Sequence, residues 1–198
     1  MNLLLLLSLV GFCLADNVLR YKPYHPARNN QEVFRTWIMK AGNLDLKSFK
    51  WSDCGNSSST LKVKELTVGP DPLVLPGTVT IGFELDVAED FDDGLSGSVE
   101  IYKKVESTFI RIPCIGNIGS CEYKDVCGLM AQIPQCPQPF IDNKIPCKCP
   151  FKKNSYKMPS SNIDIPGDPI PSGDYKATVH LKHNDAFAGC LQVSLTLT

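Results

Sequence analysis

The sequence lacks the motifs that an active site would need. It has only three histidines, and it contains no G-x-S-x-G nucleophile elbow, no H-E-x-x-H pair and no P-loop. The Cys-Cys-x-x-His run of secreted phospholipases is also missing. Without a recognisable base, acid or nucleophile, we expect neither an enzyme nor a catalytic residue, and no cofactor beyond a bound ligand.

A large net charge is missing as well. The formal net charge is −1, so nothing in the composition indicates a nucleic-acid partner. The lysine pairs Lys103-Lys104 and Lys152-Lys153 are isolated in the sequence. We expect both pairs to be solvated.

Long apolar runs are scarce. The longest covers residues 3–14, which is shorter than the about 20 residues that span a bilayer. It ends in Cys13-Leu14-Ala15, a small-x-small tripeptide of the kind that signal peptidase cleaves after. We therefore predict a secretory signal peptide over residues 1–15, and its length disfavours the alternative of a membrane anchor. The mature protein is expected to be soluble.

Cysteine, in contrast, is abundant, with nine residues in the chain. Eight lie outside the predicted signal, and an even number in a secreted chain indicates disulfides. The C-x2-C pairs of a zinc site or a redox centre are absent, so we expect no metal. Two constraints limit the pairing. Cys147 and Cys149 are too close to pair easily, and a Cys54–Cys190 bridge would close a very long loop and so stabilise most.

Residues 16–48 differ from the rest of the chain. They contain no cysteine, and they carry six basic and three acidic residues. Asn29 and Glu32 have the spacing of a capping box, and apolar residues follow at helical spacing up to Gly42. This pattern predicts a short amphipathic helix in an N-terminal extension. The helix could dock on the domain, belong to a mobile pro-segment, or meet a membrane or a partner.

From residue 49 onward, apolar and polar residues alternate. The alternation is clearest in residues 78–87, 173–183 and 190–198, and shorter strands are predicted at 61–68, 97–105 and 108–112. One buried face and one wet face are typical of antiparallel sheets. We therefore predict that residues 49–198 form one mostly β domain, an antiparallel two-sheet β-cup or sandwich with one short helix and four disulfides.

The predicted helix lies between the strands. It follows Asp125 and ends before Pro134, and its apolar residues fall at i, i+3, i+4 and i+7. These residues are Val126, Leu129, Met130 and Ile133.

Two short motifs have simple interpretations. Residues 89–94 resemble a calcium loop, but Gly94 comes one position too early for an EF-hand, so a solvated turn between strands is expected. Asn56 begins an N-S-S sequon and is a candidate glycosylation site in a surface loop.

Six stretches carry a resemblance to a known family: FKWSDCG, LTVGPDPLVLPGTVTI, IRIPCIGNIGSCEYKDVC, IPCKCPF, SGDYKATVHL and GCLQVSL. Together they resemble the ganglioside-activator branch of the MD-2-related lipid-recognition family. The resemblance covers about residues 49–198 and includes all eight mature cysteines. It implies an antiparallel β-cup that holds lipid between its sheets, with the helix residues 126–133 near the cavity. The disulfides it implies are Cys54–Cys190, Cys114–Cys121, Cys127–Cys149 and Cys136–Cys147.

The resemblance also implies two apolar loops that touch membranes. The first corresponds to residues 105–110, with Val105, Phe109 and Ile110, and the second to residues 162–173, with Ile163, Ile165 and Ile170. The second loop is shorter than is usual in the family and lacks its tryptophan. Residues 16–48 extend beyond the family pattern.

The function implied is that of a secreted or lysosomal glycoprotein that takes part in sphingolipid metabolism and ganglioside catabolism. It would lift a ganglioside-like glycolipid from a membrane, with which it is in transient contact. It would then present the lipid to a soluble glycosidase of the β-hexosaminidase kind, acting as a lipid-transporting enzyme activator. A lipid-binding signalling or interaction module without a hydrolase partner is the alternative. An esterase or phospholipase is the third and least favoured hypothesis.

Overall fold

The computed structural model describes residues 49–166 and 170–198. These residues form two antiparallel sheets, two short helices and four disulfides. The predicted signal peptide and the predicted helix within 16–48 lie outside the described residues. In the described part of the chain, no helix is long and apolar enough to cross a membrane.

Six strands form the first sheet, which we call sheet A. Its order is β1-β9-β8-β4-β5, and β6 also pairs with β4. The strands are β1 (Lys50–Asp53), β4 (Leu95–Val105), β5 (Thr108–Arg111), β6 (Glu122–Tyr123), β8 (Gly173–His183) and β9 (Ala186–Leu197). Asn184 and Asp185 both have positive φ in the two-residue β8–β9 turn, a conformation in which Asn and Asp are favoured.

Three strands form the second sheet, sheet B, in the order β2-β3-β7. They are β2 (Leu61–Gly69), β3 (Gly77–Val87) and β7 (Asn154–Ile165). The clean alternation of β3 is confirmed, since all of its predicted inward residues are buried. These residues are Val79, Ile81, Phe83, Leu85 and Val87.

Strand β7 was not predicted from the sequence, and the reason is a bulge. Its register on β3 shifts between Ile81 and Phe83, so that Ile81 faces Ser161 and Phe83 faces Met158. The extra residue reverses the alternation after Met158. Pro159, which cannot donate a ladder hydrogen bond, is tolerated here because β7 is an edge strand of sheet B.

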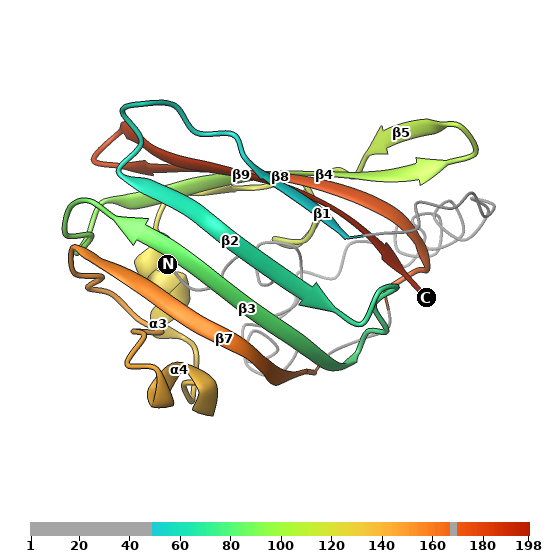
Figure 1. Cartoon of the computed structure of the whole chain (residues 1–198). Coiled ribbons are helices and arrows are strands. Elements are labelled where there is room, and N and C mark those ends of the chain that lie inside the picture. Colours follow the sequence, from blue (N-terminus) through green and yellow to red (C-terminus); the bar gives the residue numbers. More distant parts are fainter. Residues whose placement is uncertain (1–48, 167–169) are drawn as a thin grey trace.

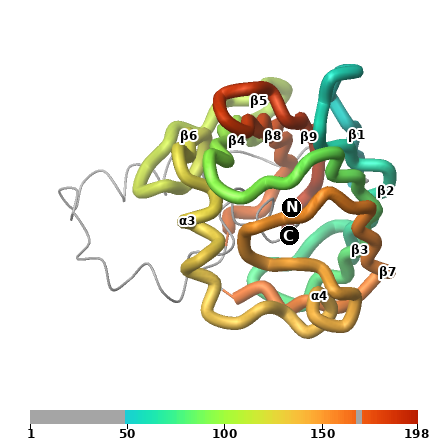
Figure 2. The backbone as a smooth tube through the Cα atoms, turned by 90° about the vertical axis from the view of Figure 1, so that its left-hand side faces the viewer, coloured from blue at the N-terminus to red at the C-terminus, as the bar shows by residue number. Residues whose placement is uncertain are grey.

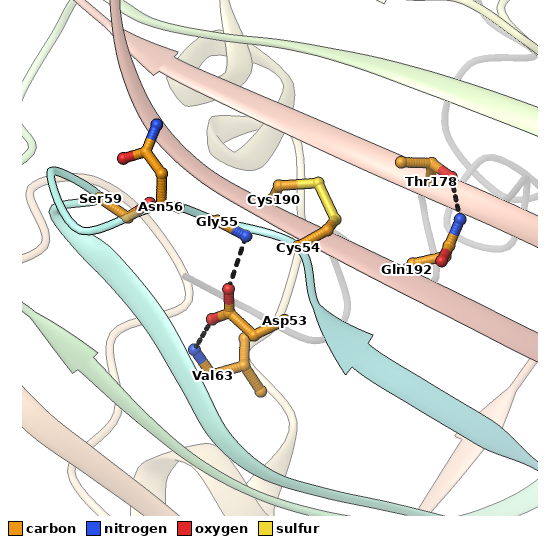
Figure 3. The surroundings of a disulfide bond; sticks show 9 residues. All are labelled: Asp53, Cys54, Gly55, Asn56, Ser59, Val63, Thr178, Cys190 and Gln192. Atoms are coloured by element: carbon orange, nitrogen blue, oxygen red, sulfur yellow. Dashed lines mark hydrogen bonds between the residues drawn. A yellow bond between two sulfur atoms is a disulfide. The ribbon is translucent and has the colours of Figure 1, made fainter.

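The two sheets meet along β1 and β2. The Asp53 carboxylate accepts hydrogen bonds from the backbone N–H of Val63 on β2 (2.7 Å) and from that of Gly55 (2.7 Å), as Figure 3 shows. Next to it, Cys54 is bonded to Cys190 of β9. One carboxylate and one disulfide therefore join this edge of the two sheets.

The chain crosses between the sheets a second time through the helical segment. Helix α3 (Val126–Ala131) and helix α4 (Gln138–Asp142) lie between β6 of sheet A and β7 of sheet B in chain order. Viewed from one end, β1 and β2 are neighbours on one side and α3 lies on the other (Figure 2). Figure 1 places both helices at one end of the sheets.

The predicted helix is present but shorter than expected. Asp125 is its N-cap, and its carboxylate accepts a hydrogen bond from the N–H of Gly128 at 2.7 Å. The helix ends at Ala131, so Ile133 follows it. The prediction of a single helix was wrong, because the short α4 in the proline-rich cysteine region has no extended apolar repeat.

The four disulfides join the pairs that the family resemblance implied: Cys54–Cys190, Cys114–Cys121, Cys127–Cys149 and Cys136–Cys147. Two of them hold the helical segment, since Cys127 in α3 is bonded to Cys149 and Cys136 to Cys147. Covalent bonds therefore fix the connection that has the least regular backbone.

We expect that none of these eight cysteines reacts with a thiol probe in the native, unreduced protein. All eight should react after reduction and unfolding, because each sulfur is held in a disulfide. Mass spectrometry of the labelled protein counts the modified residues. A single labelled cysteine from this set before reduction would contradict the four-bridge arrangement.

Candidate functional site

The inner faces of the two sheets are apolar except at Lys103 on β4. Every second residue of β3 points inward, and the same holds for β4, β8 and β9 in sheet A. The buried residues of sheet A that share this inner face are Leu95, Val99, Ile101, Tyr175, Ala177, Val179, Leu181, Leu191, Leu195 and Leu197. Two opposed apolar walls of this kind suit an apolar ligand as well as a packed core.

The predicted helix face packs against this interior. Val126 and Met130 are fully buried, and Leu129 and Ile133 are partly buried against the core. Helix α4 contributes Phe140, whose ring centroid lies 6.0 Å from that of Phe83 on β3. The helices therefore cover one end of the apolar interior.

The first predicted membrane loop lies at the opposite end. The three residues lie in strands and not in a loop, because Val105 ends β4 and Phe109 and Ile110 belong to β5, so only residues 106–107 form the turn. All three side chains are half-buried, and the β4–β5 hairpin extends beyond the rest of sheet A (Figure 1). Phe109 faces Lys104 in the register, and the Lys176 ammonium lies 4.1 Å from its ring centroid. Phe109 is thus on the outer face of sheet A, among lysines, where a cation–π contact holds its ring.

The second predicted loop begins later than expected. Ile163 and Ile165 belong to β7 and are buried, so placing them in a loop was wrong. The bulge described above hid their strand. Ile170 is half-buried and packs against the core just before β8.

Sequence reasoning missed several exposed apolar side chains. Val74, 55% exposed, lies in the connection between β2 and β3, and its neighbour Leu73 pairs with Leu197 at the end of β9. Ile115 and Ile118 are exposed in the Cys114–Cys121 loop. No charged residue lies between Cys114 and Cys121, and this uncharged loop was a signal that could have identified Ile115 and Ile118 as candidate contact residues.

Lys103 is the main surprise of the interior. It is only 2% exposed, so the expectation that both residues of the Lys103-Lys104 pair are solvated was wrong for Lys103. Alternation along β4 puts it on the same face as Val99 and Ile101, and that alternation was the available signal. Burial lowers the pKa of the Lys103 ammonium, because the interior disfavours its charged form.

Lys103→Met is therefore expected to raise the stability of the protein at pH 7. The pKa of Lys103 is lower in the folded chain than in the unfolded chain. Below the folded-state pKa, the buried lysine is charged and lowers the folding stability by the full amount. As the pH rises from that pKa towards the unfolded value of about 10.4, the folded chain loses the proton first and this loss of stability disappears. Urea unfolding at pH 7 and pH 10 measures the effect, and the gain should shrink at the higher pH. The account would be contradicted if Lys103→Met were no more stable than the wild type at pH 7, or if its gain in stability grew with pH.

Ion pairs lie on the outer, solvent-exposed face of sheet B. Lys157 lies 2.8 Å from Glu84, and Lys64 lies 2.7 Å from Asp86. Hydrogen bonds from these lysines hold the pKa of the Glu84 carboxyl and that of the Asp86 carboxyl below their usual values. All four groups are on the solvent side, so they contribute little to stability.

The acidic segment 89–94 does not gather metal ligands. Its Asp90 pairs with Lys152 at 2.7 Å, and Phe91 is fully buried. His183 lies 3.2 Å from Glu89 and 3.7 Å from Asp92, and it joins the segment to the end of β8. Over residues 49–166 and 170–198, no group of three His, Cys, Asp or Glu side chains could hold a metal ion.

Asn56 is exposed in the turn between β1 and β2. Its side-chain oxygen accepts hydrogen bonds from the N–H of Ser58 (2.9 Å) and from the Ser58 hydroxyl (2.6 Å). Ser58 is the hydroxyl residue of the sequon, and the turn adjoins the Cys54–Cys190 bridge (Figure 3). Glycosylation at Asn56 remains a prediction.

Comparison with known proteins identifies the class. The family model of the ML domain matches residues 48–197, and the chain belongs to this family. The matched region nearly coincides with the predicted domain 49–198.

Two curated relatives make the comparison more specific. The chain is 30% identical to the ganglioside GM2 activator of Mus musculus over 205 residues, which cover 100% of this chain and 98% of that protein. It is also 30% identical to the ganglioside GM2 activator of Macaca fascicularis over 160 residues, covering 77% of this chain and 84% of that protein. Both relatives are named as activators, and this chain is a non-catalytic member of the family.

Among solved structures, chicken MD-1 complexed with lipid IVa resembles this chain with a TM-score of 0.45 and 14% identity. The match covers 79% of this chain and 94% of that one.

Proposed function

We propose that this protein is a lipid carrier that lifts a ganglioside-like glycolipid from a membrane and presents it to a soluble glycosidase of the β-hexosaminidase kind. It would act in the secretory pathway or the lysosome, after removal of residues 1–15. The observation that carries the proposal is the pair of apolar inner faces, in a chain that matches two ganglioside GM2 activators at 30% identity.

The position of the two helices at one end of the sheets supports entry of the lipid from the other end. Helices α3 and α4 cover one end of the interior, and two disulfides hold them there. The other end carries the β4–β5 turn, the connection with exposed Val74, and the start of β8. Half-buried and exposed apolar residues at that end can contact a bilayer surface while a lipid enters between the sheets.

Native mass spectrometry after incubation with vesicles tests the binding step. Vesicles of phosphatidylcholine with a minority of one ganglioside serve as the lipid source, and the protein is separated from them before measurement. A complex with one bound ganglioside is expected. Protein that carries no lipid under these conditions would contradict the proposal.

The presentation step needs a separate assay. A soluble β-hexosaminidase is given either the ganglioside in vesicles or a water-soluble chromogenic substrate. The protein should accelerate hydrolysis of the ganglioside alone, because the soluble substrate needs no carrier. Ganglioside binding without any acceleration would favour the alternative, a lipid-binding module without a hydrolase partner.

A further inference from the structure

The described part of the chain begins at the open end of the apolar interior. The N–H of Phe49 donates a hydrogen bond to the Asp71 carboxylate, 2.6 Å away, in the connection between β2 and β3. The same connection pairs with the end of β9 through Leu73 and Leu197. Figure 1 shows the start of β1 on the side of the β4–β5 hairpin and away from the two helices. Residues 16–48 therefore join the domain beside the end at which we propose that lipid enters.

This end of the domain also presents apolar side chains that are not fully covered. Val74 is 55% exposed. At the opposite end, α3 and α4 cover the interior, whereas neither of these described helices lies at the open end (Figure 1). Three more apolar residues at the open end are only partly buried against the core: Phe49, Val68 and Ile170.

The sequence that precedes the domain contains a segment whose pattern needs an apolar surface. Residues 29–42 have the pattern of a short amphipathic helix, in which one face carries Phe34, Trp37, Ile38 and Ala41. Isolated helices shorter than about 12–15 residues are marginal in water, and most helices in proteins are stabilised by packing of such a face. We therefore expect this segment to be helical only where its apolar face is buried.

The length of the linker limits which surface the predicted helix can reach. Residues 42–48 connect Ala41 to Phe49, and a chain of this length spans at most about 30 Å. A strand of 11 residues such as β8 is longer, at about 36 Å. The C-terminal part of the predicted helix can therefore reach the open end, whereas the end at which α3 and α4 lie is too distant.

Charge disfavours the outer face of sheet A as the docking surface. Residues 16–48 carry six basic and three acidic residues, which leaves a net charge of +3. Near the open end, the register of sheet A places one exposed basic residue from each of β5, β8 and β1 in a single row across that face. These residues are Arg111, Lys176 and Lys50. The row repels a positive segment, so the apolar opening between the sheets is the favoured surface.

We propose that residues 30–41 pack their apolar face over the open end of the interior, against Val74 and its apolar neighbours, and compete there with lipid. The segment is then an internal cover that an entering lipid displaces. The docking depends only on the apolar residues of the two surfaces, whereas the competition with lipid rests on the proposed function. A pro-segment that does not dock and a helix that binds membranes are the alternatives, and the test distinguishes them.

Photo-cross-linking at position 37 locates the segment without any lipid. The chain that begins at residue 16 is produced with p-benzoylphenylalanine in place of Trp37, freed of lipid and irradiated. Peptide mass spectrometry after reduction and proteolysis should find adducts in residues 68–76, which include Val74. The matched control carries the same probe in place of Thr36, on the opposite face of the helical pattern, and should give few adducts there.

Two substitutions of similarly exposed residues test the docking surface. Val74→Asp places a charge at the open end and should lower the total yield of position-37 adducts at that end by about tenfold, which corresponds to about 1.4 kcal/mol. Ile141→Asp makes the same kind of change on α4, at the opposite end, where Ile141 is 52% exposed. It should leave the yield unchanged.

A transfer assay tests the competition with lipid. Trp37→Gln removes the largest apolar side chain of the cover, so transfer of a ganglioside from phosphatidylcholine vesicles should become several-fold faster than in the wild type. Thr36→Gln, on the opposite face, should leave the rate unchanged. Protein loaded with the ganglioside should also lose the position-37 adducts at the open end.

Each alternative gives a different result. Position-37 adducts that are absent from the open end would overturn the docking and leave the carrier function untouched. Slower transfer by Trp37→Gln would indicate a membrane-binding helix and would overturn the cover, as would an unchanged rate. Adducts that persist undiminished in the lipid-loaded protein would overturn the competition alone. If neither the wild type nor Trp37→Gln takes up lipid, the competition and the carrier function are both wrong.

Discussion

Removal of the Cys54–Cys190 bridge is expected to be the most damaging change to the fold. The variant Cys54→Ala/Cys190→Ala opens a loop with a sequence separation of 136 residues, and its unfolding free energy should fall by about 5 kcal/mol in the chain-entropy model. For a domain of this size, that loss lowers the melting temperature by roughly 10–20 °C. Differential scanning calorimetry under non-reducing conditions measures it.

The matched control is Cys114→Ala/Cys121→Ala, which opens a loop with a separation of only seven residues. The same model gives a loss of about 2.5 kcal/mol for this bridge. The long bridge also lies beside the Asp53 carboxylate that joins the sheets, so its loss exposes that contact as well. If both double variants melted at the same temperature, the bridge at the joined edge would have no special role.

Phe109→Asp is expected to have the largest effect on lipid transfer. An aromatic side chain that enters the membrane surface gains about 1.5–3 kcal/mol, and an aspartate there loses that gain and resists leaving water. Extraction of lipid from vesicles should therefore fall by about tenfold or more. Folding should be nearly unaffected, because the new carboxylate would face Lys104 and lie near Lys176.

Two further variants make this result interpretable. Phe109→Leu keeps an apolar side chain and should retain most of the extraction. Ile163→Asp places a charge on a buried residue of β7 and should destabilise the fold strongly, as a core position does. A melting temperature of Phe109→Asp as low as that of Ile163→Asp, with unchanged transfer per folded molecule, would assign Phe109 to the core.

The strands with unbroken alternation were predictable from the sequence. In β3 and β8 every inward residue is buried as expected, because a regular strand repeats its environment every second residue. In β7 the sequence contains the same kinds of residues, but the bulge near Pro159 changes the phase, and no local signal reports a register set by β3. The short β1 and β6 depend on their partners in the same way.

The candidate site was predictable in part. Its apolar wall followed from alternation, and its disulfide pairs followed from the resemblance to the family. The position of Phe109 on the outer face required the register of β5 on β4, which the sequence does not contain. Lys103 was misjudged because two adjacent lysines suggest a wet surface, although a strand must send one of them to each face.

The bulge in β7 also bears on how the protein behaves at high concentration. Strand β7 is an edge of sheet B, and a long regular edge is a template for pairing with the edge of a second molecule. Pro159 offers no N–H at that edge, and the register shift beside it interrupts the ladder. A second copy therefore cannot add a continuous strand along all 12 residues of β7, which protects the protein from edge-to-edge aggregation.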